Sequence, residues 1–168
     1  MSITMYQVSI PVFQKMLTNL SGILTKAEAY AEARKIDPSV LLSARIFPDM
    51  FSLVRQVQIA ADFAKGAGAR LAGLEVPSFP DTETTFAELQ QRLTKTQAFL
   101  SSLTAEQIDG SEARPITIKG HGMEFHFTGQ DYLTTFVLPN FYFHMTTAYA
   151  ILRMGGLSLG KADFVGQL

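Results

Sequence analysis

Asn140 and His144 are the residues whose types and spacing are best suited to chemistry. In a helix, with about 100° between successive residues, both project from one face, among apolar residues such as Val137 and Ile151. A buried amide or imidazole without a hydrogen-bond partner costs roughly 1–3 kcal/mol. The two side chains therefore either satisfy each other and their neighbours in the core, or face a pocket that holds water, a metal ion or a ligand.

Pro139 lies directly before Asn140. Inside a helix, proline removes one backbone hydrogen bond and clashes with the carbonyl four residues back, so it bends the helix. A bend beside an inward-facing Asn and His predicts a ligand pocket lined by Pro139, Asn140 and His144. The alternative is a bend that only wraps the helix around the core, with His144 as a hydrogen-bonded core residue.

The helix predicted over residues 48–72 carries polar residues along one flank of its apolar stripe, at spacings of three and four: Arg55, Gln58, Asp62 and Lys65. The simplest interpretation is a solvated edge with weak local ion pairs. Gln58 is closest to the stripe and is a further candidate for the ligand pocket. Ile59 and Phe63 lie outside the main stripe, which predicts a second apolar face for another helix or a second subunit.

His121 and His126 are weaker candidates for a site. His121 stands between glycines at a predicted turn, and His126 falls on the polar face of a predicted strand, so both are expected at the surface. The sequence contains no GxSxG, Walker loop, GxGxxG or HExxH motif. Catalytic residues therefore stay unassigned.

Apolar residues at spacings of three and four predict four long helices, over residues 5–35, 48–72, 82–102 and 129–154. Pro48 is expected to open the second helix, and Asp81 or Thr82 to cap the third. A capping-box pattern that begins at Thr104 predicts one more helical turn. Apolar and polar residues alternate over 115–127, which predicts a β-hairpin. The expected fold class is all-α, a helix bundle with a small hairpin inserted before the last long helix.

The composition is that of one globular domain, 1–168, with 47% hydrophobic residues. The 14 Lys and Arg are scattered and balanced by 15 Asp and Glu, which argues against a nucleic-acid partner. The absence of cysteine excludes disulfides and thiolate metal sites and fits a reducing compartment. Residues 132–152 are uncharged but include Pro139, Asn140 and His144. They predict the central helix of a cytoplasmic protein rather than a membrane span.

Nearly the whole chain resembles a known family, through the segments FPDMFSLVRQVQIAADFAKG, TFAELQQRLTKTQAFL, FTGQDYLTTFVLPNFYFHMTTAYAILR and GKADFVG. The most specific part is LPNFYFH. On these segments the chain resembles an uncharacterised bacterial domain-of-unknown-function family within the DinB/YfiT-like superfamily, whose members are regarded as metalloenzymes. The resemblance implies a four-helix bundle, often dimeric. It also implies a divalent metal held by three histidines, one on the second long helix and an HxxxH pair on the last.

The resemblance implies that the HxxxH pair falls on Asn140 and His144, and the remaining histidine on Gln58 or Gln56. Only His144 is a histidine here, and amide oxygens are poor ligands for zinc or nickel. A zinc or nickel ion on His144 is therefore a weaker expectation than a remodelled polar pocket.

Two kinds of function follow at nearly equal weight. The first is a metal-dependent small-molecule transferase or hydrolase with a degenerate metal site, as the resemblance implies. The second is a non-catalytic protein that uses the same pocket without metal, either to bind a small ligand or to form a dimeric interaction surface. The expected partners are a small-molecule ligand and a second copy of the chain in a homodimer, with neither nucleic acid nor membrane.

Overall fold

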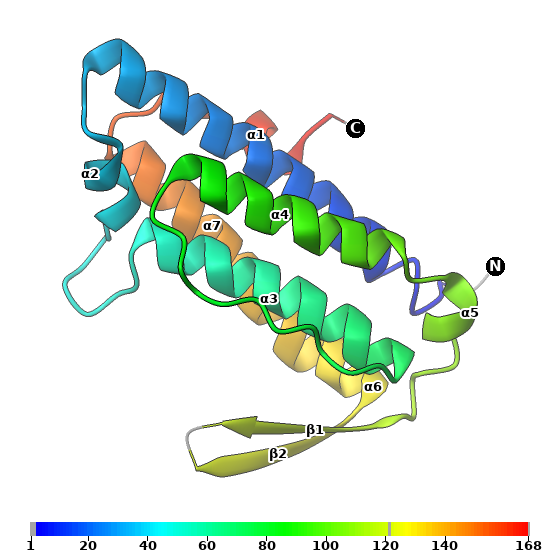
Figure 1. Cartoon of the computed structure of the whole chain (residues 1–168). Helices are drawn as coiled ribbons and strands as arrows, with labels where there is room; N and C mark the ends of the chain where they lie inside the picture. The colour runs from blue at the N-terminus through cyan, green and yellow to red at the C-terminus, as the bar shows by residue number, and fades with distance from the viewer. Residues whose placement is uncertain (1–2, 121, 168) are drawn as a thin grey trace.

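Four long helices lie side by side in the computed structural model, which describes residues 3–120 and 122–167 (Figure 1). They are α1 (Ile10–Arg34), α3 (Leu53–Ala72), α4 (Phe86–Ser101) and α7 (Leu138–Met154). Shorter helices connect or flank them: α2 (Pro38–Ser43), α5 (Ala105–Ile108), α6 (Gly129–Asp131) and α8 (Lys161–Val165). The chain is thus mostly helical, as the spacing of its apolar residues predicts.

The apolar stripe of the first helix is buried as predicted. Phe13, Leu17, Leu20 and Leu24 of α1 are fully buried, and the ring of Phe13 meets that of Phe141 on α7 edge to face, with centroids 5.0 Å apart. Helix α3 packs against both α7 and α4. Two faces of α3 are therefore covered within the chain, and its polar residues lie close to two other helices.

Helices α1 and α3 begin later than predicted. Helix α1 begins at Ile10, with Pro11 in its first turn, rather than near residue 5. Helix α3 begins at Leu53, and its expected start at Pro48 is wrong. The N–H of Leu53 donates to the carbonyl of Ala44 at 2.9 Å, so the segment between α2 and α3 closes as a loop before the helix starts.

Helix α4 also begins later, because a different residue caps it. Thr85 accepts a hydrogen bond from the N–H of Glu88, and the Glu88 carboxylate accepts from the N–H of Thr85, which together form a capping box. The expected caps, Asp81 and Thr82, lie upstream in the loop between α3 and α4, which runs back along α3 (Figure 1). Asp81 instead pairs with arginines, as described below.

The last long helix changes its winding beside the proline. Helix α6 continues into a π-helical segment, η1 (Tyr132–Val137), which leads into α7. The N–H of Leu138 donates to the carbonyl of Leu133, five residues back, and Pro139 then occupies the first turn of α7. Proline is tolerated there because its missing N–H needs no partner in a first turn. Where the sequence predicts a bend at Pro139, the structure has a π-helical segment directly before the proline.

The predicted hairpin consists of β1 (Pro115–Gly120) and β2 (Met123–Thr128), paired antiparallel with Ile118 opposite Phe125. His126 is exposed on β2, and its Nδ1 lies 3.1 Å from the Thr117 hydroxyl. The surface position predicted for His126 is confirmed. His121, for which a surface position was also predicted, lies outside the described residues.

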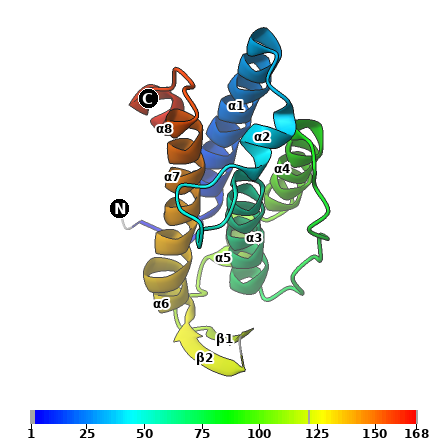
Figure 2. The ribbon, with the colours of Figure 1, turned by 90° about the vertical axis from the view of Figure 1, so that its left-hand side faces the viewer.

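The C-terminal tail, for which the sequence pattern predicts no element, forms α8 against α1. The side-chain amide of Asn19 donates to the Phe164 carbonyl at 2.9 Å, and Lys26 pairs with Asp163 at 2.5 Å. Figure 2 shows α8 beside α7, with the hairpin at the opposite end of the molecule. Over residues 3–120 and 122–167, no helix combines the length and the apolar character that crossing a membrane requires.

Candidate functional site

His144 is buried between α7 and α3, where it is held by a glutamine. Its Nδ1 lies 2.7 Å from Oε1 of Gln56, and the Gln56 amide nitrogen donates to the carbonyl of Phe51 at 3.1 Å. The imidazole also stacks on the Phe63 ring, with centroids 6.0 Å apart, and meets Phe143 edge to face. Only 8% of His144 is exposed. The imidazole is therefore fixed in position by one hydrogen bond and two aromatic rings.

The surroundings of His144 favour its neutral form. Burial lowers its pKa from the ordinary value, and the positive charge of Arg55 lowers it further. Because the Gln56 amide nitrogen faces Phe51, the Gln56 oxygen faces the imidazole, and Nδ1 must then carry the proton and donate. Within the described residues Nε2 has no hydrogen-bond partner, so His144 keeps one basic nitrogen.

Asn140 and Gln58 do not reach His144. The Asn140 amide nitrogen donates at 2.7 Å to the Phe136 carbonyl, four residues back in its own helical segment. Gln58 is buried, but it donates to Glu83 at 2.9 Å and accepts from Arg55, on a different side of α3. The structure thus brings Gln56 to His144, while Gln58 and Asn140 have partners of their own.

These donors do not fit zinc or nickel. The oxygen of Gln56 is engaged with Nδ1 of His144, and the amide of Asn140 is tied to a backbone carbonyl. The Gln56 oxygen is thus not free to ligate, and although the Asn140 oxygen has no hydrogen-bond partner among the described residues, amide oxygens are weak ligands for these metals. Among the residues that the structure describes, no group of three or more His, Asp or Glu side chains is arranged to hold a metal ion. Among the described residues, His144 therefore has no set of His, Asp or Glu side chains with which to share a metal ion.

A groove lies beside this pair, between α3, η1 and β1. It has a volume of about 280 Å³. Its apolar walls are Ile59, Phe63, Ile118 and Phe136, and the charged side chains of Arg55 and Asp62 also line it. The rings of Phe63 and Phe136 meet edge to face with centroids 5.7 Å apart, and Phe63 is the ring on which His144 stacks. The second apolar face predicted for Ile59 and Phe63 therefore packs partly within the chain and lines a groove.

Arg70 and Tyr132 give this groove its polar end. The Arg70 guanidinium donates to the Tyr132 hydroxyl at 3.1 Å and lies 5.9 Å from the centre of its ring. Burial raises the pKa of Tyr132, and the charge and hydrogen bond of Arg70 only partly oppose that effect, so the phenol stays neutral. In the described part of the chain Arg70 forms no ion pair with a carboxylate, so an anion in the groove would meet an uncompensated cation.

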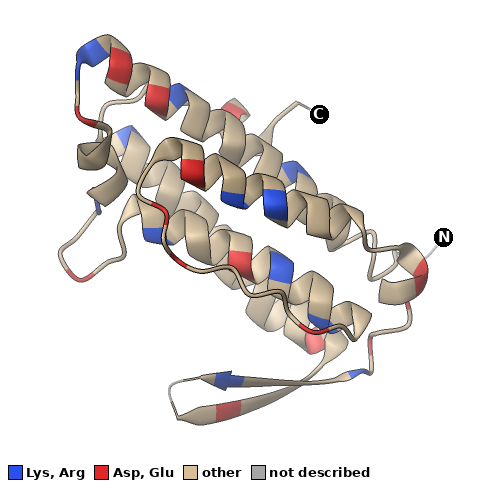
Figure 3. Cartoon of the chain, viewed as in Figure 1, with Lys and Arg blue, Asp and Glu red and all other residues tan. Residues whose placement is uncertain are grey.

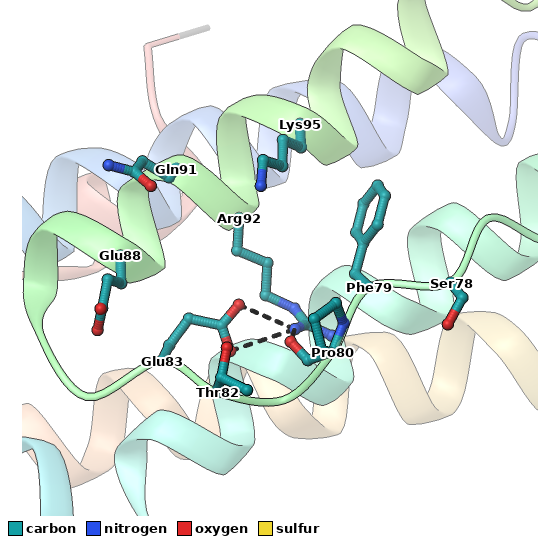
Figure 4. A pocket seen from close by; sticks show the side chains of 9 residues that line it. All are labelled: Ser78, Phe79, Pro80, Thr82, Glu83, Glu88, Gln91, Arg92 and Lys95. Carbon is teal, nitrogen blue, oxygen red and sulfur yellow. Dashed lines mark hydrogen bonds and ion pairs between the residues drawn. The ribbon is translucent and has the colours of Figure 1, made fainter.

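Arg92 is the charged centre that the sequence patterns missed. Its side chain is 1% exposed and crosses from α4 to the loop 74–85 (Figure 4). It pairs with Asp62 at 2.9 Å, Asp81 at 2.9 Å and Glu83 at 3.0 Å, and it donates to the carbonyl of Pro80 at 3.2 Å. Figure 3 shows acidic positions along this loop, facing basic positions on the helices. The sequence feature that could have indicated this network is the position of Arg92 inside the apolar stripe of α4, where a charged side chain needs buried partners.

The solvated edge predicted on α3 is therefore wrong for Gln58 and Lys65, whereas Arg55 and Asp62 are partly exposed and Asp62 forms the expected local ion pair with Lys65. Lys65 and Gln58 are buried, Lys65 pairs with Asp62 at 2.8 Å, and Arg55 pairs with Asp81. The loop 74–85 runs along this flank of α3 (Figure 1) and supplies Asp81 to Arg55 and Glu83 to Gln58, whereas the partner of Lys65 comes from α3 itself. A helical pattern alone does not show which face a distant loop will cover.

Hydrogen bonds keep the network ionised against the cost of burial. Burial opposes ionisation of Glu83, but hydrogen bonds from Arg92 and Gln58 outweigh it, so the pKa of Glu83 is lowered. Burial likewise opposes the charge of Arg92, but its bond to Glu83 and the charges of Asp62 and Asp81 raise its pKa. The network therefore consists of charged groups at neutral pH.

Comparison with known proteins agrees with the resemblance seen in the sequence. A crystal structure of a DinB family member protein from Shewanella denitrificans superposes with a TM-score of 0.88 and 42% sequence identity, over 97% of this chain and 92% of that one. No curated protein matches the chain. The family model for the domain of unknown function DUF1993 matches residues 5–165. The chain therefore belongs to the DUF1993 family.

Proposed function

We propose that this protein binds a small aromatic or branched apolar anion, without a metal, in the groove between α3, η1 and β1. The observation that carries the proposal is the position of Arg70. Its guanidinium lies at one end of a groove with mostly apolar walls and is bound to a neutral phenol, with no carboxylate paired to it in the described residues. The other two charged residues that line the groove, Arg55 and Asp62, already have ion-pair partners. A few polar groups among apolar walls are typical of small-molecule sites, and 280 Å³ suits a small ligand.

The Gln56–His144 pair supports binding rather than metal chemistry. In a metal site of the DinB type, the corresponding positions would present free ligands to the ion. Here the Nδ1 of His144 is engaged with Gln56, and Asn140 bonds to its own helical segment. His144 instead supports Phe63 from behind, so it shapes the groove wall. This favours the small-ligand protein over the metal-dependent transferase or hydrolase.

The finer description of the fold is part of the same proposal. The packing of α1, α3, α4 and α7 and the likeness to a DinB family member protein support a DinB/YfiT-like four-helix bundle that forms one domain over 1–168. The expected homodimer and cytoplasmic location stay predictions. Phe143 and Met154 on α7 are more than half exposed and would suit an interface, which sedimentation at micromolar concentration would test.

The test compares two probes that differ in one charge, 3-phenylpropanoate and 3-phenylpropanamide. A hydrogen bond to a charged group contributes about 1.5–3 kcal/mol, so the acid should bind roughly tenfold or more tightly than the amide. In Arg70→Met this preference should be lost. Arg34→Met is the matched control, because Arg34 also lies over a tyrosine, Tyr30, but on α1 away from the groove. Binding is measured from amide chemical shifts of the labelled protein.

Three results would overturn the proposal. The first is equal binding of both probes to the unmodified protein, and the second is an unchanged preference in Arg70→Met. The third is a stoichiometric metal in protein purified without an affinity tag, together with a metal requirement for probe binding, which would restore the metal-dependent alternative. His144→Gln should weaken binding of both probes alike, because it alters the support of Phe63 and removes no contact with the ligand.

A further inference from the structure

A second cavity lies on the other side of Arg92, between α4 and the loop 74–85. It has a volume of about 330 Å³ and is separate from the aromatic groove. Figure 4 shows α4 on one side and the loop on the other, with the Arg92 side chain crossing between them. Phe79 of the loop supplies an aromatic surface, and its ring is held by Lys65, whose Nζ lies 4.3 Å from the ring centre. The cavity therefore has a fixed wall as well as charged ends.

Its charges are separated along α4. Glu88 and Lys95 both line the cavity, and seven residues of helix place them about 10.5 Å apart along the axis. Lys95 is exposed and has no ion pair in the described part of the chain. Figure 4 shows Glu88 and Lys95 on opposite sides of Arg92. A ligand along the cavity would thus meet an acidic end and a basic end.

The carboxylate at the acidic end stays charged and has an oxygen to spare. Oε2 of Glu88 accepts hydrogen bonds from the N–H groups of Thr84 and Thr85, which lower the pKa of Glu88. Its Oε1 has no hydrogen-bond partner among the described residues. Glu83 lies at the same end, but its charge is already offset by Arg92.

A buried donor of Arg92 lacks an acceptor. Its Nη atoms are occupied by carboxylates and a carbonyl, but Nε is buried and has no hydrogen-bond partner. A buried donor that belongs to a charged group and is left unpaired is costly. Arg92 lines the cavity, so a ligand oxygen that displaced the atoms now covering Nε would supply the missing partner.

We propose that this cavity binds a small zwitterion, a molecule of amino-acid type with an ammonium and a carboxylate at separate ends. The carboxylate lies between Lys95 and Nε of Arg92, the ammonium is bound by Oε1 of Glu88, and the apolar middle packs on Phe79. A dianion such as phosphate fits less well, because Glu83 and Glu88 share the cavity with the two cations. This site is independent of the aromatic groove, and neither requires the other.

The test uses three probes of similar length: 6-aminohexanoate, hexanoate and hexylamine. Each is titrated into the full-length labelled protein and followed by amide chemical shifts. We expect changes over residues 78–95 and binding of 6-aminohexanoate at least tenfold tighter than binding of either singly charged probe. Similar affinity for all three probes, or shifts confined to other parts of the chain at millimolar concentration, would overturn the proposal.

Two variants that each remove one charge test which end of the cavity binds which end of the ligand. Lys95→Gln should remove the advantage of 6-aminohexanoate over hexylamine, and Glu88→Gln its advantage over hexanoate. Glutamine at position 88 keeps the capping-box chemistry, so α4 should stay folded. Lys119→Gln, on the exposed strand β1, is the control and should bind like the unmodified protein. If Lys95→Gln and Glu88→Gln retain the full preference for the zwitterion, the assignment of the two ends is wrong.

Discussion

Replacing Arg92 with methionine tests the charged network most directly. Methionine keeps most of the unbranched stem but removes the guanidinium that joins α4 to Asp62, Asp81 and Glu83. Removing one member of a buried ion pair costs about 3–5 kcal/mol, because the remaining charge stays buried without a partner. Three carboxylates would lose a cation at once in this variant.

The structure places the expected loss near the lower limit of that range. Asp62 keeps Lys65 as a partner, Asp81 keeps Arg55, and both carboxylates are more than a third exposed. Glu83, with an 11% exposed side chain, is left without a cationic partner among the described residues. We therefore expect the free energy of unfolding to fall by about 3 kcal/mol. For a chain of this size that corresponds to roughly 6–12 °C in melting temperature.

Urea unfolding measures this loss, with Arg55→Met as the matched control. Arg55 pairs with Asp81 while both are partly exposed, so its removal should cost less than about 1 kcal/mol. The free energy of unfolding should fall less when Glu83→Gln is added to Arg92→Met than when Glu83→Gln is made in the unmodified protein. In the Arg92→Met background the substitution removes a buried charge that has already lost its partner. A loss of under about 1 kcal/mol for Arg92→Met, no larger than the control, would refute the view that this network fastens the loop.

Three further predictions concern the core. Gln56→Ala should lower the free energy of unfolding by about 1–3 kcal/mol in urea, because it leaves Nδ1 of His144 buried without an acceptor. The pKa of His144 is lower in the folded protein than in the unfolded chain, so as the pH drops below 6.5 the imidazole is protonated first in the unfolded chain. The free energy of unfolding should therefore fall with decreasing pH in that range. His144→Gln should lose less stability between about pH 7.5 and about pH 5.5, and equal losses in both proteins would contradict this. Gly129→Ala should cost about 1–3 kcal/mol in the same assay, because the added methyl group overlaps the Ser111 carbonyl oxygen, and a melting temperature equal to that of the unmodified protein would exclude the clash.

The local patterns were sufficient for most helices and for the hairpin. The stripe from Phe13 to Leu24 has one helical period and is buried, and the alternation around Ile118 has the period of a strand. These elements were predictable because each depends on neighbours within a few residues. The starts of α3 and α4 were not, because Pro48 and Asp81 are acceptable helix-start residues that are engaged in loops.

The sequence by itself determined that an imidazole would lie on the most apolar helix and need a partner. Only the tertiary structure decided which partner. Gln56 and Gln58 are two residues apart and so point about 200° apart on α3, one toward α7 and the other toward the loop 74–85. The packing of α3 between two other helices determines which glutamine meets His144, and the spacing of apolar residues along the sequence does not indicate it. The Arg92 network has the same origin, because its members come from two helices and a loop that only folding brings together.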